Sequence, residues 1–132
     1  MSLQKKAALA RLSALLAPGG VLALSLLGEG TFGEWRAAHA ALGLAPGTPD
    51  FPGLANIRAA FPPGQLALED EDHRARPASA LDFLRGLRAI GADTPAPGHR
   101  PLGAGELRAV LRQMGENPVV SYRLAYAMWS AQ

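Results

Sequence analysis

The first part of the chain changes from a helical to a strand-like distribution of apolar residues. Four leucines recur at the spacing of one helical face: Leu9, Leu12, Leu15 and Leu16. The sequence Pro18-Gly19-Gly20 ends this predicted helix, because proline and glycine interrupt helical hydrogen bonding. Val21 to Leu27 is then a continuous apolar run of strand length. We therefore expect a strand that is covered on both faces.

A second helix is predicted after the turn Gly28-Glu29-Gly30. Thr31 and Glu34 have the spacing of a capping box, in which a hydroxyl and a carboxylate bond free amides of the first helical turn. The inward face of this helix carries apolar residues and one histidine: Trp35, Ala38, His39 and Leu42.

The remaining elements are separated by two stretches rich in proline and glycine, 43–53 and 92–105. Between these stretches we expect a short helix at 54–61, a strand at 65–73, and a helix that begins at a second capping box, Ser79 with Asp82, and runs through Ile90. A further helix has its apolar residues at helical spacing, with Gly115 after its end: Leu107, Val110, Leu111 and Met114.

The last predicted element is a strand from Val119 to Ser130 with apolar residues on both faces, which is typical of a central strand. The order of elements predicts an α/β fold, with a three-stranded mixed sheet and flanking helices. We expect residues 1–132 to form a single domain, since a chain of 132 residues has the usual size of one.

Composition and charge exclude several classes of protein. The 132 residues include 13 Lys and Arg against 11 Asp and Glu, and a net charge of +2 is too small for a charged nucleic-acid-binding face. No cysteine is present, which excludes disulfides, a thiolate zinc site and a cysteine nucleophile. No apolar run approaches the roughly 20 residues of a membrane span, and no export signal opens the chain. We expect a cytoplasmic protein that binds neither nucleic acid nor a membrane.

Gly28, Gly30 and Gly33 match the G-x-G-x-x-G pattern of dinucleotide-binding proteins, between a predicted strand and a predicted helix. Such glycines let a pyrophosphate approach a helix N-terminus. The fold also needs a second parallel strand that ends at an acidic residue, whereas Asp50 lies in a proline-rich loop. A plain turn is favoured, and a small dinucleotide-binding domain is the alternative.

Two further features favour structural roles. The acidic residues 69–72 and His73 end a predicted strand, and its alternation puts no three well-placed ligands on one face, so a solvated strand end is favoured over a metal site. His39 lies on an apolar helical stripe without an acid or serine at a suitable spacing. This favours a packed histidine over a general base. No catalytic residue or metal ligand is therefore predicted.

Arg85 and Arg88 share one side of their predicted helix with Asp82, at i, i+3 spacing. Such a group is normally a solvated, salt-bridged surface. A pair of arginines is also what a carboxylate-bearing substrate requires, because a guanidinium binds a carboxylate through two parallel hydrogen bonds.

Several motifs resemble known methyltransferases. The segment 15–25, with Pro18-Gly19-Gly20 before an apolar strand, resembles the connection into the fifth strand of class I S-adenosylmethionine methyltransferases. Three other segments resemble the malonyl-acyl-carrier-protein O-methyltransferases of biotin synthesis: 28–36 (GEGTFGEWR), 81–92 (LDFLRGLRAIGA) and 118–122 (PVVSY). The resemblance covers essentially the whole chain, but it corresponds to only the C-terminal half of such an enzyme.

This resemblance implies half of a Rossmann-like fold whose last strand is antiparallel and central. It implies an enzyme that uses S-adenosylmethionine to methylate the free carboxyl of malonyl-acyl carrier protein or malonyl-CoA, with Arg85 or Arg88 holding that carboxylate. In the superfamily the cofactor site lies in the other half, so this segment alone should bind no cofactor and be inactive. The alternative to a methyltransferase is a non-catalytic α/β domain that mediates an interaction.

The same arrangement has a consequence for the strand Val21 to Leu27. Its outer edge would pair with a strand that this segment lacks, whereas the charged strand 65–73 is a protected natural edge. We therefore expect chains to associate through the edge of Val21–Leu27, most simply as a two-fold homodimer.

Overall fold

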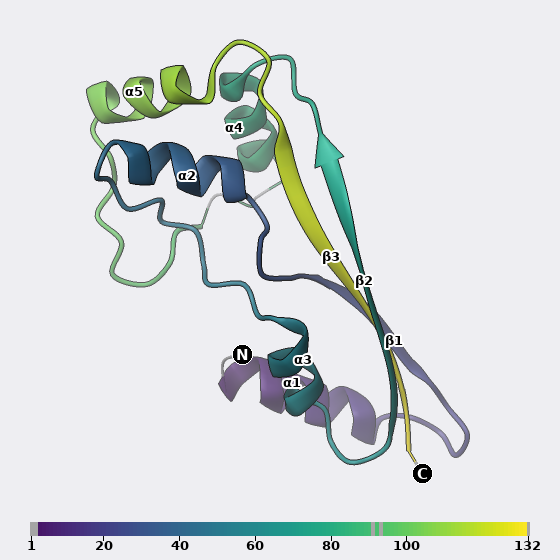
Figure 1. Cartoon of the computed structure of the whole chain (residues 1–132). Helices are drawn as coiled ribbons and strands as arrows, with labels where there is room; N and C mark the ends of the chain where they lie inside the picture. Colours follow the sequence, from purple (N-terminus) through teal and green to yellow (C-terminus); the bar gives the residue numbers. More distant parts are fainter. Residues whose placement is uncertain (1–2, 91, 93, 132) are drawn as a thin grey trace. The chain divides into compact units, whose positions relative to one another are not determined.

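The computed structural model describes residues 3–90, 92 and 94–131, and within them the chain has an α/β fold (Figure 1). Its elements follow one another in the order α1 (Leu3–Ala14), β1 (Leu22–Leu27), α2 (Gly33–Ala41), α3 (Leu54–Ala60), β2 (Gln65–Ala75), α4 (Ala80–Ala89), α5 (Ala104–Met114) and β3 (Val120–Ser130). The predicted order of helices and strands is confirmed. None of the described helices has the length and apolar character needed to cross a membrane.

The strands form one sheet in the order β1-β3-β2. β3 is antiparallel to β1, in a register that places Leu22 opposite Trp129 and Leu27 opposite Leu124. β1 and β2 run in the same direction on the two sides of β3 (Figure 1). The last strand is therefore antiparallel and central, as expected, but the three-stranded sheet is antiparallel throughout and not mixed, because β1 and β2 each pair only with β3 within the described residues.

The residues divide into two compact units. The first comprises the described residues within 1–31, 51–73 and 123–132, and the second those within 32–50 and 74–122. The boundary crosses β2 after His73 and β3 after Tyr122, so both strands contribute residues to each unit.

In the first unit, α1 contacts α3, and the buried side chains come from both helices and β3: Leu9, Ile57, Ala60, Ala125, Ala127 and Trp129. The Trp129 indole N–H donates to the Pro62 carbonyl at 2.9 Å, which satisfies the polar atom of a buried ring. Only Leu9 of the predicted first helical face is buried. The helix also ends at Ala14 and not at Leu16, because Leu15 and Leu16 donate three residues back, in the tighter geometry of a terminal turn.

The expectation that β1 is covered on both faces is wrong for the described structure. Along β1, half-buried leucines alternate with the exposed Ala23 and Ser25. Ala23 and Ser25 lie opposite Met128 and Tyr126 of β3, which are 55% and 40% exposed. One face of this part of the sheet therefore carries small or exposed side chains. Within the apolar run 21–27, large and small residues alternate, as the two faces of a strand do.

In the second unit, α5 contacts both α2 and α4. The core contains an aromatic cluster in which Phe32 and Trp35 lie edge-to-face against Phe83, with ring centroids 5.5 and 5.6 Å apart. Phe32 makes a similar contact with Tyr122 at 5.2 Å. Buried aromatic pairs of this geometry contribute about 0.5–1.5 kcal/mol beyond the burial of their area.

The capping box predicted for α2 is wrong. The N-cap is Phe32, in the left-handed conformation with φ 58°, and no side chain caps the helix. Thr31 Oγ1 instead accepts the Arg123 backbone N–H at 3.0 Å, and the Glu34 carboxylate accepts the Ser121 N–H at 2.7 Å. Both side chains have the acceptor chemistry of caps, but their partners lie on β3.

The other two predicted helix ends are confirmed. The Asp82 N–H donates to Ser79 Oγ at 3.0 Å, at the start of α4. Gly115 follows α5 with φ 82°, a conformation that glycine adopts without the steric cost of a side chain.

Candidate functional site

Arg85 and Arg88 lie one turn apart on α4, and both side chains are exposed. Side chains at this spacing have Cβ atoms about 5–6 Å apart. Among the described residues, the structure assigns neither guanidinium a hydrogen bond or an ion pair, so the salt bridge to Asp82 that their spacing allows is not formed. Both arginines are therefore available to a ligand from solvent.

The remaining residues of α4 explain why both arginine side chains are exposed. The Ser79 cap holds the first turn, and Phe83 is buried between Phe32 and Trp35. Because Phe83 fixes the inward side of the helix, the exposed positions include Arg85 and Arg88. The helix thus combines a rigid aromatic anchor with a basic outer surface.

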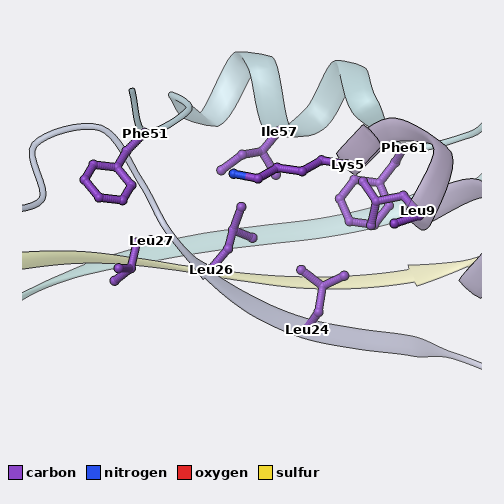
Figure 2. Close-up of a pocket in the computed structure, with 9 residues that line it drawn as sticks. Lys5, Leu9, Leu24, Leu26, Leu27, Phe51, Ile57 and Phe61 are labelled. Carbon is purple, nitrogen blue, oxygen red and sulfur yellow. The ribbon is translucent and has the colours of Figure 1, made fainter. Parts of the chain in front are cut away.

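A pocket of about 370 Å³ lies in the first unit between α1, α3 and β1 (Figure 2). Its lining is almost wholly apolar and includes Leu9, Leu24, Leu26, Phe51, Ile57 and Phe61. Lys5 also lines it, and Figure 2 shows the Lys5 side chain extending over the pocket. The lining residues supply no carboxylate or hydroxyl, and their one ionisable side chain is that of Lys5.

A second pocket, of about 320 Å³, lies in the second unit at the contact of α2 and α5. We call it the α2–α5 pocket. Glu34 and Ala38 of α2 line it, together with Gln113 of α5 and with Asn117 and Pro118 from the segment before β3. It combines small apolar side chains with amide groups and one carboxylate.

Glu34 connects this pocket to β3. Its Oε2 accepts the Ser121 hydroxyl at 2.6 Å, beside the bond from the Ser121 N–H. Burial opposes ionisation of the carboxyl, but the two hydrogen bonds from Ser121 outweigh it and, with the charge of Arg74, hold the pKa of Glu34 below its ordinary value. The role of Glu34 was not predicted, because its position also matches a helix cap and no local pattern points to Ser121.

The three glycines of the G-x-G-x-x-G pattern do not form an open phosphate loop. The Gly28 N–H donates to the Arg123 carbonyl at 2.7 Å, and a side chain on Gly28 would meet the Pro52 carbonyl at 3.4 Å. Gly30 adopts φ 99°, which requires glycine in the turn, and Gly33 opens α2. These are the features of the plain strand-to-helix turn.

The strands also lack dinucleotide-fold geometry. The sheet neighbour of β1 among the described residues is the antiparallel β3, whereas the fingerprint belongs to a pair of parallel strands. Asp50 is fully exposed in a loop, 3.8 Å from Arg36. The dinucleotide alternative therefore has no structural support.

The acidic strand end forms pairs with β3. Asp70 Oδ2 lies 2.9 Å from Arg123 Nε, and the Tyr126 hydroxyl donates to Glu71 at 2.7 Å, a bond that raises the pKa of Tyr126. No group of three His, Cys, Asp or Glu residues within the described ranges is arranged to hold a metal ion.

His39 has the packed position that its sequence context predicts. It is 1% exposed, with its ring edge-to-face against Trp35 at 4.7 Å. Its Nδ1–H donates to the Trp35 carbonyl at 2.7 Å, since a carbonyl can only accept. Burial lowers the pKa of His39, so the ring is neutral near pH 7 and shielded from a substrate.

The chain is similar to two curated proteins, and no family model matches it. The biotin biosynthesis bifunctional protein BioCD of Bordetella avium is 47% identical over 124 residues, which are 93% of this chain and 26% of the relative. A malonyl-acyl-carrier-protein O-methyltransferase of Magnetococcus marinus is 37% identical over 127 residues, 93% of this chain and 47% of the relative. The chain thus spans about half or less of the length of these relatives, and it is homologous to one segment of each of them.

Proposed function

We propose that this chain forms part of an enzyme that methylates the free carboxyl of a malonyl thioester in biotin synthesis. The observation that carries this proposal is the identity of 47% to a bifunctional protein of biotin biosynthesis and of 37% to a malonyl-acyl-carrier-protein O-methyltransferase, each along 93% of the chain. The carrier of the thioester is an acyl carrier protein or coenzyme A. S-adenosylmethionine is the methyl donor of the complete enzyme.

The described residues do not fit the methyl donor. The glycine turn at 28–30 is bonded to Arg123, so it offers no cradle for an adenosyl group. The apolar pocket of the first unit has no acidic residue for a ribose, and the carboxylate in the α2–α5 pocket is already bonded by Ser121. We therefore assign to this chain the acceptor side of the reaction, and we expect the chain alone to be inactive and to bind no cofactor.

Arg85 and Arg88 are the residues that we assign to the malonyl carboxylate. A carboxylate is a sufficient nucleophile for a methyl group, so the acceptor site needs no strong base. It needs orientation, which a guanidinium supplies through two parallel N–H donors to the two carboxylate oxygens. The exposure of both arginines, and their spacing of one turn on a helix anchored by Phe83, support this role.

The test is steady-state kinetics of the complete enzyme that contains this segment. We expect Arg85→Ala or Arg88→Ala to lower kcat/KM for the malonyl thioester roughly 10- to 100-fold, the cost of losing a hydrogen-bonded charge. Lysine at the same position should restore only part of this loss, because it cannot bind bidentately.

The matched control is Arg58→Ala, which removes an exposed arginine from α3. It should leave kcat/KM unchanged. Normal kcat/KM for both α4 variants would show that this helix does not bind the carboxylate. If the unmodified enzyme methylated no malonyl thioester, the proposed activity itself would be wrong.

We also propose that isolated chains associate as a homodimer through β1. This strand lies at an end of the strand order β1-β3-β2, so one of its edges is unpaired within the described sheet. The edge is apolar, unlike β2 with its acidic residues, and exposed apolar edges tend to pair with another chain.

A further inference from the structure

The α2–α5 pocket is not used by the acceptor site on α4. It lies between the first turns of α2 and the end of α5, the helices with the most extensive packing in the second unit. Its volume of about 320 Å³ is at the lower end of the range for small-molecule sites, roughly 300–1,000 Å³. The pocket therefore suits a slender ligand.

The carboxylate that lines this pocket already has hydrogen-bond partners within the chain. The Glu34 carboxylate accepts two hydrogen bonds from Ser121, at 2.7 and 2.6 Å, and Arg74 acts on it electrostatically. A ligand anion would face this carboxylate, and a ligand cation would compete with groups that already satisfy it. The pocket thus disfavours a charged ligand and favours a neutral one.

The free polar groups of the pocket are amides. Gln113 and Asn117 are exposed at its rim, and the structure assigns neither side chain a hydrogen bond among the described residues. Each amide offers two N–H donors and one carbonyl acceptor. Ala37, Ala38 and Pro118 supply the apolar part of the lining. The complementary ligand is a neutral chain in which amide groups alternate with short apolar segments.

We propose that the α2–α5 pocket binds the pantetheine arm that carries the malonyl thioester. This inference rests on the proposed function, because that function supplies a substrate attached to such an arm. Pantetheine has two amides separated by methylene groups and carries no charge. Coenzyme A and an acyl carrier protein present the same arm, so the pocket accounts for recognition of the thioester by a feature common to both carriers.

The test is a titration of the 15N-labelled chain with pantetheine, followed by amide resonances. We expect saturable shifts at the Gln113 and Asn117 side chains and in residues 34–38 and 113–119. Gln113→Met and Asn117→Leu keep the side-chain size but remove the amide, and each should weaken binding roughly fivefold, the effect of one lost hydrogen bond. Gln65→Met, at an exposed glutamine of β2, is the matched control and should bind as the unmodified chain does.

Two outcomes would overturn the inference. One is the absence of a saturable shift up to about 10 mM pantetheine, where a site with a Kd of ~1 mM is filled. The other is an equal response to a capped diglycine peptide, which would show a general affinity for amides. The proposed function fails separately, in the kinetics of the arginine variants, because pantetheine binding by this chain requires neither the methyl donor nor Arg85 and Arg88.

Discussion

Phe32 and Glu34 show how individual residues attach α2 to the last strand. Phe32 adopts φ 58°, which is uncommon for a residue with a side chain, and its N–H donates to the Ser121 carbonyl at 2.8 Å. Glu34 then accepts both the N–H and the hydroxyl of Ser121. The strained conformation at Phe32 therefore accompanies a set of bonds that all converge on one serine.

The Glu34 bonds make acid stability a direct test of this attachment. The pKa of Glu34 is lowered in the folded chain, so its contribution is fully present above the pKa of an unfolded glutamate, about 4.3, and is lost as pH falls through the folded pKa. Glu34→Gln should lower the free energy of unfolding at pH 7 by about 1 kcal/mol, allowing for solvent screening. The difference from the unmodified chain should shrink below pH 4.

Urea unfolding at a series of pH values measures this effect. Glu116→Gln, at an exposed glutamate after α5, is a suitable control and should leave the pH profile unchanged. A pH-independent difference between Glu34→Gln and the unmodified chain would contradict a role for the ionised carboxylate.

Sequence reasoning at the residue scale succeeded where partners are local. Ser79 caps α4 through an amide three residues away, and His39 packs on the stripe where its spacing places it. It failed for Thr31 and Glu34, whose partners are some 90 residues away in the chain: the separations are 92 for Thr31–Arg123 and 87 for Glu34–Ser121. A side-chain oxygen near the start of a helix can accept from the N–H groups of the first helical turn or from those of a strand. Local spacing does not distinguish these two kinds of partner.

At the scale of elements, the glycine that precedes β2 and the glycine within α4 have opposite effects on packing. A side chain on Gly64, just before β2, would lie 2.5 Å from the Ser130 carbonyl oxygen and 2.7 Å from Trp129 Nε1. A side chain on Gly86, within α4, would meet nothing within 4 Å. The first glycine allows two segments to approach closely, and the second only adds flexibility to a helix.

We therefore expect two alanine substitutions with opposite effects on the free energy of unfolding. Gly64→Ala should lower it by about 1–3 kcal/mol through overpacking against backbone, and Gly86→Ala should raise it by about 0.5–1 kcal/mol. Thermal or urea unfolding measures both. Equal effects of the two changes would show that the close approach at Gly64 is not a constraint.

Element order was predictable because hydrophobic period and turn residues are local signals. The α/β order followed from the succession of helical and strand-like segments, and the central position of β3 followed from the apolar residues on both faces of 119–130. Coverage of β1 was not predictable in the same way. An apolar run does not report whether residues such as Ala23 and Ser25 meet another layer, and in the described structure they are exposed.

At the scale of the whole molecule, the unpaired edge of β1 predicts association. We expect isolated chains to form dimers, and Leu24→Lys or Ala23→Pro to weaken them by adding a charge to the edge or removing an amide. Leu68→Lys, at a half-buried leucine of β2, is the matched control for loss of stability and should not change the association. Light scattering that shows a folded monomer at ~100 μM, a concentration at which exposed edges associate, would contradict the prediction.

Because β2 and β3 contribute residues to both compact units, the two units should unfold together. Trp35 lies in the second unit and Trp129 in the first, so each unit has one of the two indole fluorophores. Trp35→Phe and Trp129→Phe would therefore each leave a reporter for a single unit. Because β2 and β3 each contribute residues to both units without a break in the strand, we expect fluorescence and far-ultraviolet dichroism to give one midpoint in each variant. Separate midpoints would mean that the units melt independently, whereas one midpoint makes residues 1–132 a single folding unit.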